Sequence, residues 1–119
     1  MELIRTNFQE GVEVQRILDL KDKNLSENSN IISSDKQIEL IAKALSSKTR
    51  RQILKEIQKY EKGMDVSEIA SNLGMTEANI SAQIKKLIEA GLIKCDYCSG
   101  QHGVRKISKL KYNTLIIKF

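Results

Sequence analysis

The most constraining feature of this sequence is a pair of short amphipathic segments joined at a single glycine, within residues 66–81. Ala70 is small enough to let two helices cross closely, and Gly74, four residues later, tolerates the positive φ that a tight turn requires. Ile80, six residues after the glycine, is placed to insert between the helices and fix their angle. This spacing is typical of a helix-turn-helix, although two packed helices without a binding role would share it.

Two further helices are predicted before this pair. Asp35 is expected to cap the first, since its carboxylate can accept a free backbone N–H. The buried stripe of that helix is predicted from the spacing of Ile38, Ile41, Ala42 and Leu45. Either Ser46 or Ser47 can cap the next helix, over about 48–60, which Gly63 ends. Its inward residues are predicted to be Ile53, Leu54 and Ile57.

The pair itself and the segment after it also have clear boundaries. A third helix is expected over 66–73, and a fourth begins after the N-cap Thr76 and ends at Gly91. The inward positions of these two helices are predicted to be Ile69, Ala70 and Leu73, followed by Ile80, Ile84, Leu87 and Ile88. Extended segments are expected at 92–94 and 104–110 around a loop near 100–103, and a last strand at 115–117.

The N-terminal part is less regular. Residues 1–22 fit a short strand or a helix equally well, and the Ser- and Asn-rich stretch 23–34 is interpreted as a linker. The chain is therefore divided into an unassigned extension over 1–34 and one domain over 35–119. A secretory signal and a membrane-spanning segment are not expected, because no sufficiently long apolar run is present.

The net charge of +5 is unevenly distributed. Residues 35–63 contain eight basic and four acidic side chains, and residues 93–119 contain six and one. Between them, residues 64–92 contain two basic and four acidic side chains. Basic flanks around a nearly neutral centre suggest a polyanionic partner, provided that the centre is itself a recognition element.

Three segments together resemble a known family. The stretches 43–54, 68–93 and 100–106 are similar to the opening helices, the helix-turn-helix and the wing of ArsR-like winged-helix transcriptional regulators, in a form typical of archaeal members. The resemblance covers about residues 38–110. It implies a mainly α protein with a small β wing (α+β), built of three to four helices and a β-hairpin.

This resemblance implies a sequence-specific regulator that binds double-stranded DNA, with the helix at about 76–90 in the major groove. Asn79 and Gln83 are candidate adenine readers, since an amide can contact N6 and N7 together. The other candidates on this helix are Thr76, Glu77, Ser81, Lys85 and Lys86, of which all but Glu77 are expected at phosphates. Family members often have Arg and His where Ala82 and Gln83 stand here, so a preference for A·T-rich sites is a hypothesis.

The remaining DNA contacts are expected on the flanks. The basic wing at about 94–110 is expected on the flanking backbone or in the minor groove. Its candidates are His102, Arg105 and Lys106, with Lys94, Lys109 and Lys111 extending the basic surface. Arg50 and Arg51, near a helix N-terminus, are further candidates for backbone contact.

A metal or redox function is the alternative that the two cysteines leave open. The cysteine pair by which many ArsR-like proteins sense metals has no counterpart in residues 64–68. Cys95, Cys98 and His102 form a C-x2-C-x3-H arrangement that zinc would accept if a turn at residues 96–97 brought the sulfurs together. Residues three apart on a regular strand point to opposite faces, so ordinary reduced thiols are favoured.

No enzyme activity and no cofactor are predicted, because no phosphate-binding loop or paired carboxylates are recognisable. The expected partners are duplex DNA and a second copy of the chain, in the cytoplasm and without a membrane. The effector is unknown. The dimerisation element is sought in residues 1–45 or 115–119. A winged-helix module that binds protein or RNA is the rival interpretation.

Overall fold

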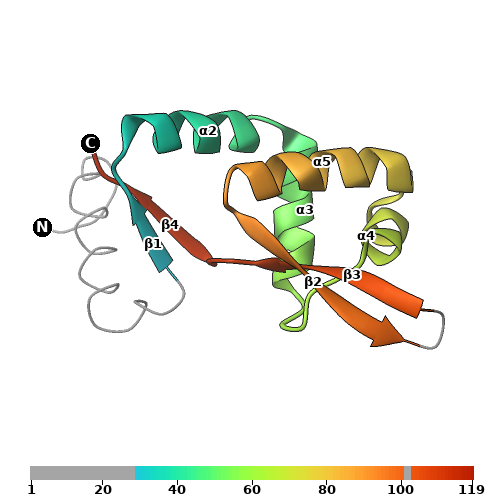
Figure 1. Ribbon diagram of the computed structural model, residues 1–119. Coiled ribbons are helices and arrows are strands. Elements are labelled where there is room, and N and C mark those ends of the chain that lie inside the picture. Colours follow the sequence, from blue (N-terminus) through green and yellow to red (C-terminus); the bar gives the residue numbers. More distant parts are fainter. Residues whose placement is uncertain (1–28, 101–102) are drawn as a thin grey trace, which may run out of the picture.

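The computed structural model describes residues 29–100 and 103–119. In these ranges the order of elements is β1 (Ser29–Ile32), α2 (Asp35–Leu45), α3 (Lys48–Gln58), α4 (Val66–Leu73), α5 (Glu77–Glu89), β2 (Ile93–Gly100), β3 (Gly103–Leu110) and β4 (Thr114–Ile117). Figure 1 shows α3 passing behind α5, with the β2–β3 hairpin extending away from the helices. The predicted fold class, mainly helical with a β-hairpin wing, is confirmed.

The helix boundaries follow from local capping. The hydroxyl of Ser47 accepts from the backbone N–H of Arg50, so the second of the two predicted serine caps is the one used. Asp65 and Glu68 form a reciprocal capping box at the start of α4. The predicted cap at Asp35 is wrong: Asp35 is the first residue of α2 and Ser34 precedes it without a side-chain cap. An acidic residue in the first turn still suits the helix dipole.

The core is aliphatic, as the sequence predicted. Its most completely buried side chains in the helices are Ile41, Ile53, Ile57, Ile69, Ile80 and Leu87. Burying each such side chain contributes about 1.5–3 kcal/mol. On α2, however, the prediction for Ala42 is wrong, because Ala42 is exposed and Ala44 is buried. The helix turns Ala44 rather than Ala42 toward the cluster formed by α3 and α5.

The linker interpretation of residues 23–34 is wrong for residues 29–32. These residues form β1, which pairs in parallel with β4 from Ser29 opposite Thr114 to Ile32 opposite Ile117. The backbone N–H of Lys118 continues the ladder by donating to the carbonyl of Ile32 at 2.8 Å. The serines and asparagines of this stretch favour a loop, but the Ile31–Ile32 pair has the β-branched character of a strand.

The wing, defined as the β2–β3 hairpin over residues 93–110, is attached to the helices beside Gly63. Met64 and Ser108 exchange two backbone hydrogen bonds of 3.0 and 2.8 Å, so the loop after α3 pairs with β3. Gly63 has φ of +86°, and a Cβ built there would lie 2.5 Å from the carbonyl oxygen of Ser108. Only glycine allows this close approach of two backbones.

Replacing Gly63 by alanine is therefore expected to cost more than replacing another glycine of similar φ. Gly74→Ala is the matched control, because its φ is +66° but, apart from its chain neighbours, no atom of the described residues lies within 4 Å of the built Cβ. We expect Gly74→Ala to cost about 1–2 kcal/mol from backbone strain. Gly63→Ala should cost about 3 kcal/mol or more, because overpacking is added. Equal urea midpoints for the two variants would contradict the close approach.

Candidate nucleic-acid interface

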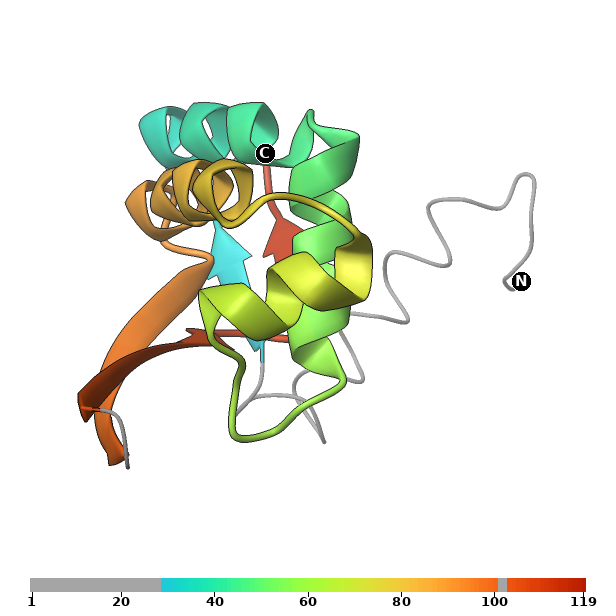
Figure 2. The same ribbon diagram turned by 90° about the vertical axis from the view of Figure 1, so that its right-hand side faces the viewer.

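The turn between α4 and α5 has the predicted geometry. Ala70 is buried at the crossing of the two helices and Ile80 has no exposed surface. Gly74 adopts the left-handed conformation at the end of α4, and the backbone N–H of Met75 donates to the carbonyl of Ala70 at 3.0 Å. Thr76 then caps α5 by accepting from the backbone N–H of Asn79 at 3.1 Å. Figure 2 views these two helices and the turn that joins them. The local chain thus fixes the direction in which α5 begins.

The candidate residues of α5 lie together on its outer side. Ile80, Ile84 and Leu87 face the core and Ile88 packs against it, so most of the remaining positions of the helix are exposed. The exposed candidates in and before α5 are Thr76, Glu77, Asn79, Ser81, Lys85 and Lys86. Gln83 is half-buried. The N-terminal half of this surface presents amides and hydroxyls with one carboxylate, and the two lysines follow one turn later.

Three side chains on this surface are joined in a chain of hydrogen bonds. Arg50 donates from a terminal guanidinium nitrogen to Oε1 of Gln83 at 2.8 Å. The Nε2 group of Gln83 donates to Oδ1 of Asn79 at 3.1 Å. Asn79 in turn places Nδ2 at 3.9 Å from the sulfur of Met75, a weak contact. The two predicted amide readers are therefore oriented by the protein before any ligand arrives.

Arg50 and Arg51 both lie over the C-terminal end of α2. The Nε of Arg50 donates to the carbonyl of Ala44 at 2.7 Å, and its other terminal nitrogen donates to the carbonyl of Lys43 at 3.0 Å. Arg51 donates to the carbonyl of Leu45 at 2.7 Å. These bonds satisfy helix-end carbonyls that lack partners within α2. Sequence reasoning missed this role, because it depends on the turn between α2 and α3.

On the wing, Arg105 is bound to the start of α4. Its Nε donates to Oδ2 of Asp65 at 2.9 Å, a terminal nitrogen also pairs with this carboxylate, and Glu68 lies 3.1 Å away. Burial raises the pKa of the Asp65 carboxyl, but hydrogen bonds from the Glu68 backbone and from Arg105 outweigh it. The pKa of Asp65 therefore lies below its ordinary value of 3.8. This pair could not be predicted from local sequence patterns, because its members lie forty residues apart.

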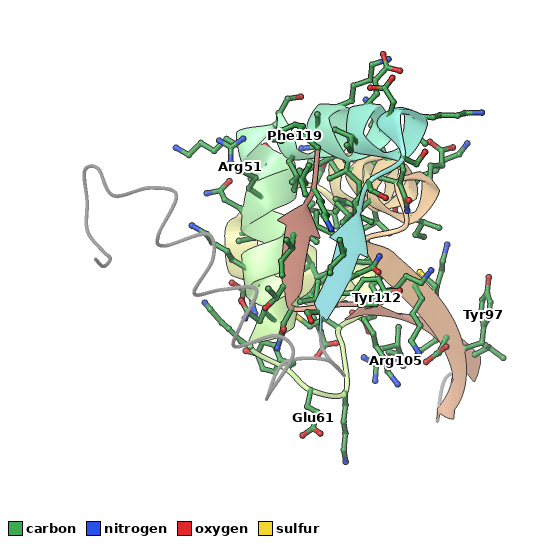
Figure 3. The ribbon with its side chains drawn as sticks, turned by 90° about the vertical axis from the view of Figure 1, so that its left-hand side faces the viewer. Arg51, Glu61, Tyr97, Arg105, Tyr112 and Phe119 are labelled. Atoms are coloured by element: carbon green, nitrogen blue, oxygen red, sulfur yellow. The ribbon has the colours of Figure 1, made fainter. Side chains whose placement is uncertain are left out.

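Other wing residues lie at the surface. Tyr97 projects outward from β2, as Figure 3 shows, and neither it nor the exposed Val104 on β3 was among the predicted site residues. Lys106 and Lys94 are exposed, whereas Lys109 forms an ion pair with Asp96 at 3.1 Å. Sequence reasoning overlooked these two residues, because an aromatic or apolar side chain is not expected to be exposed. His102 lies outside the described residues.

The turn at residues 96–97 on which the metal hypothesis depended is not present. Asp96 and Tyr97 pair with Ile107 and Lys106 within a continuous antiparallel ladder. Cys95 is half-buried, with its sulfur 3.5 Å from the Ser108 hydroxyl. Among the side chains that the structure describes, no three metal-ligating groups cluster. The side chain of Cys98, like His102, lies outside that set, so their part in metal binding stays a hypothesis.

Comparisons with known proteins agree with this geometry. Residues 47–94 match the profile of a family described as "Bacterial regulatory protein, arsR family". No curated protein sequence matches the chain. Among the described residues, none of the helices combines the length and apolar character needed to cross a membrane.

Solved structures share the fold. One is a homodimeric winged helix-turn-helix DNA-binding domain from Mycobacterium bovis, described as a possible ArsR-family regulator, with 28% identity and a TM-score of 0.55. The match covers 64% of this chain and 65% of that one, just under two thirds of the relative. Another ArsR-family transcriptional regulator has 27% identity and a TM-score of 0.50, over 62% and 75% of the two chains.

HlyU from Vibrio cholerae, at 20% identity and a TM-score of 0.53 over 66% and 78% of the chains, shares the fold alone. The archaeal attribution stays a prediction. The family profile covers α3, α4, α5 and the first residues of the wing. Residues 47–94 are therefore similar to the ArsR family, and the described part of the chain has a winged helix-turn-helix fold.

The ion pair between the wing and α4 gives a prediction for stability. Arg105→Ala should lower the free energy of unfolding by about 0.5–1 kcal/mol at neutral pH, the range of partly exposed pairs. Because the folded-state pKa of Asp65 is depressed, this contribution is present above pH about 4 and is lost as the pH falls through the folded pKa.

Denaturation curves of the wild type and of Arg105→Ala should therefore converge at low pH. Lys106→Ala, at the exposed neighbouring position, is the control and should not change stability at either pH. A difference between Arg105→Ala and the wild type that persists at pH 2 would show that the side chain acts through packing instead.

Proposed function

We propose that this chain is a sequence-specific transcriptional regulator that binds double-stranded DNA, with α5 in the major groove and the wing on the flanking backbone or minor groove. The observation that carries the proposal is the surface of α5. Its first two turns present hydroxyl and amide groups at Thr76, Asn79, Ser81 and Gln83, beyond a turn that fixes the helix direction. The two amides can discriminate base edges, whereas the two hydroxyls are expected at phosphates.

Exposed cations lie on α5 beyond this polar surface and on the wing. Lys85 and Lys86 follow on α5, and Lys94 and Lys106 are exposed on the wing. Such side chains supply affinity through phosphates without specifying sequence. Arg105 is the exception, because a phosphate would have to compete with the carboxylates of Asp65 and Glu68 for its guanidinium. Its proposed DNA contact therefore requires that the wing first release it from α4.

The proposal includes a dimer that acts in the cytoplasm. The Mycobacterium bovis relative is described as homodimeric, and two copies would place two α5 helices one DNA turn apart on a pseudo-palindromic site. Residues 1–45 and 115–119 remain the proposed dimerisation regions. Within them the exposed large apolar side chains that the structure describes are Ile31, Leu40, Ile117 and Phe119. The DNA-binding unit is proposed to span residues 35–119.

Titration of the full chain with duplex DNA tests this function. With about six phosphate contacts, affinity should fall roughly a thousandfold between 50 and 200 mM salt. Selection from random duplexes should return A·T-rich half-sites about one helical turn apart. Binding that does not respond to salt would contradict the proposal. Selected sites with guanine at the positions that α5 contacts would contradict the preference for A·T-rich sites.

Two variants distinguish base recognition from binding to the phosphate backbone. Asn79→Ala should reduce the preference for the selected site over random DNA, and leave the salt dependence unchanged. Lys86→Ala should weaken binding to both DNAs equally and reduce the salt slope by about one. If Asn79→Ala weakened binding to both DNAs equally and Lys86→Ala reduced the sequence preference, the base contacts would lie elsewhere on the domain.

A further inference from the structure

We propose that Arg50 is a positioning residue for recognition: it fixes which way the amides of Gln83 and Asn79 face, and thereby sets the hydrogen-bond pattern that α5 presents to a base pair. The inference rests on the proposed function, and it changes the role of Arg50 from the phosphate contact expected from the sequence. It concerns two neighbouring helices, since Arg50 is on α3 and both amides are on α5.

The first step is the chemistry of the donor. A guanidinium has five N–H donors and no acceptor, whereas the two ends of a glutamine amide are similar in shape and opposite in hydrogen bonding. A terminal nitrogen of Arg50 lies 2.8 Å from the amide of Gln83, so the oxygen of that amide must face Arg50. The Nε2 group of Gln83 is then directed to the opposite side.

The second step transmits this choice along α5. Gln83 and Asn79 lie four residues apart on a helix and are therefore neighbours on its surface. Because Nε2 of Gln83 donates to the Asn79 amide at 3.1 Å, the atom that receives it must be Oδ1. Arg50 thus determines the orientation of an amide that it does not touch.

The third step explains why Arg50 itself does not move. Its Nε and its second terminal nitrogen donate to the carbonyls of Ala44 and Lys43 at the end of α2, at 2.7 and 3.0 Å. With three directions of its planar group engaged, the guanidinium has one orientation relative to α2 and α5. The packing of α2 and α3 against α5 therefore sets the orientation of the Gln83 and Asn79 amides.

The pattern left for DNA is specific. Asn79 keeps one lone pair on Oδ1, and among the described residues the contact of its Nδ2 group is the weak one to Met75. One acceptor beside one donor matches N6 and N7 of adenine. Gln83 keeps a single free N–H, which fits an acceptor on a neighbouring base. Without Arg50, both amides could turn over and present the reverse pattern equally well.

The experiment compares Arg50→Met with Arg51→Met in the full chain. Both variants lose bonds to carbonyls at the end of α2, but only Arg50 reaches Gln83. On duplexes that differ at the single base pair assigned to Asn79, Arg50→Met should lose about tenfold or more of the wild-type preference. Arg51→Met should keep that preference whatever its effect on overall affinity. Equal loss in both variants would overturn the inference.

A measurement without DNA directly tests the relay, which is the chain of hydrogen bonds from Arg50 through Gln83 to Asn79. In NMR spectra of the free protein, the side-chain amide protons of Gln83 and Asn79 should be distinct and protected in the wild type and in Arg51→Met. In Arg50→Met the amide signals of both residues should move toward the chemical shifts of a solvent-exposed side-chain amide without a fixed orientation. Unchanged amide signals in Arg50→Met would overturn the inference.

Gln83→Glu is expected to reverse the orientation of the Asn79 amide rather than to abolish it. A carboxylate accepts at both oxygens, so it can keep Arg50 while forcing Asn79 to turn Nδ2 toward it. The base preferred opposite Asn79 should then change to a different one, and retention of the wild-type base would contradict the relay. Absence of duplex binding by the wild type overturns the proposed function and the reading role with it. Unchanged preference in Arg50→Met, with binding intact, overturns the inference alone.

Discussion

The aliphatic cluster between α3, α4 and α5 is the constraint on which the rest of the structure depends. Ile53, Ile69 and Ile80 are buried without exposed surface, and each contributes about 1.5–3 kcal/mol to folding. Because the three side chains belong to three different helices, their packing sets the angle of α5 relative to the other two. Every outward position of α5, and so every proposed base contact, follows from that angle.

Polar contacts then refine what the cluster positions. Glu56, buried on α3, accepts from Asn72 of α4 at 3.0 Å and from Lys59 at 3.1 Å, and these bonds, the first above all, hold the pKa of its carboxyl below the ordinary value of 4.5. Arg50 connects α3 to α5 in the same way. Each helix of the motif is thereby joined to α3 by a charge-assisted hydrogen bond as well as by apolar packing.

Features encoded within a few residues could be predicted from the sequence. The left-handed turn at Gly74, the cap at Thr76 and the inward face of α5 depend only on neighbours three or four positions away. Contacts between distant segments could not be predicted. The pairing of Arg105 with Asp65 and the capture of Arg50 by the end of α2 are set by tertiary packing, to which local patterns are insensitive. The outward positions on α5 were predictable, but the orientation of their amides was not.

The parallel pairing of β1 with β4 has a consequence for the order in which the chain folds. Ser29 lies opposite Thr114, so this small sheet closes a loop of about 85 residues, and the entropy of that closure is compensated only after the intervening helices have condensed. During synthesis, β1 leaves the ribosome before any described helix and remains unpaired until β4 has been made. The helical motif can therefore acquire its geometry while both flanking strands are still unpaired, and we expect the two-stranded sheet to form last.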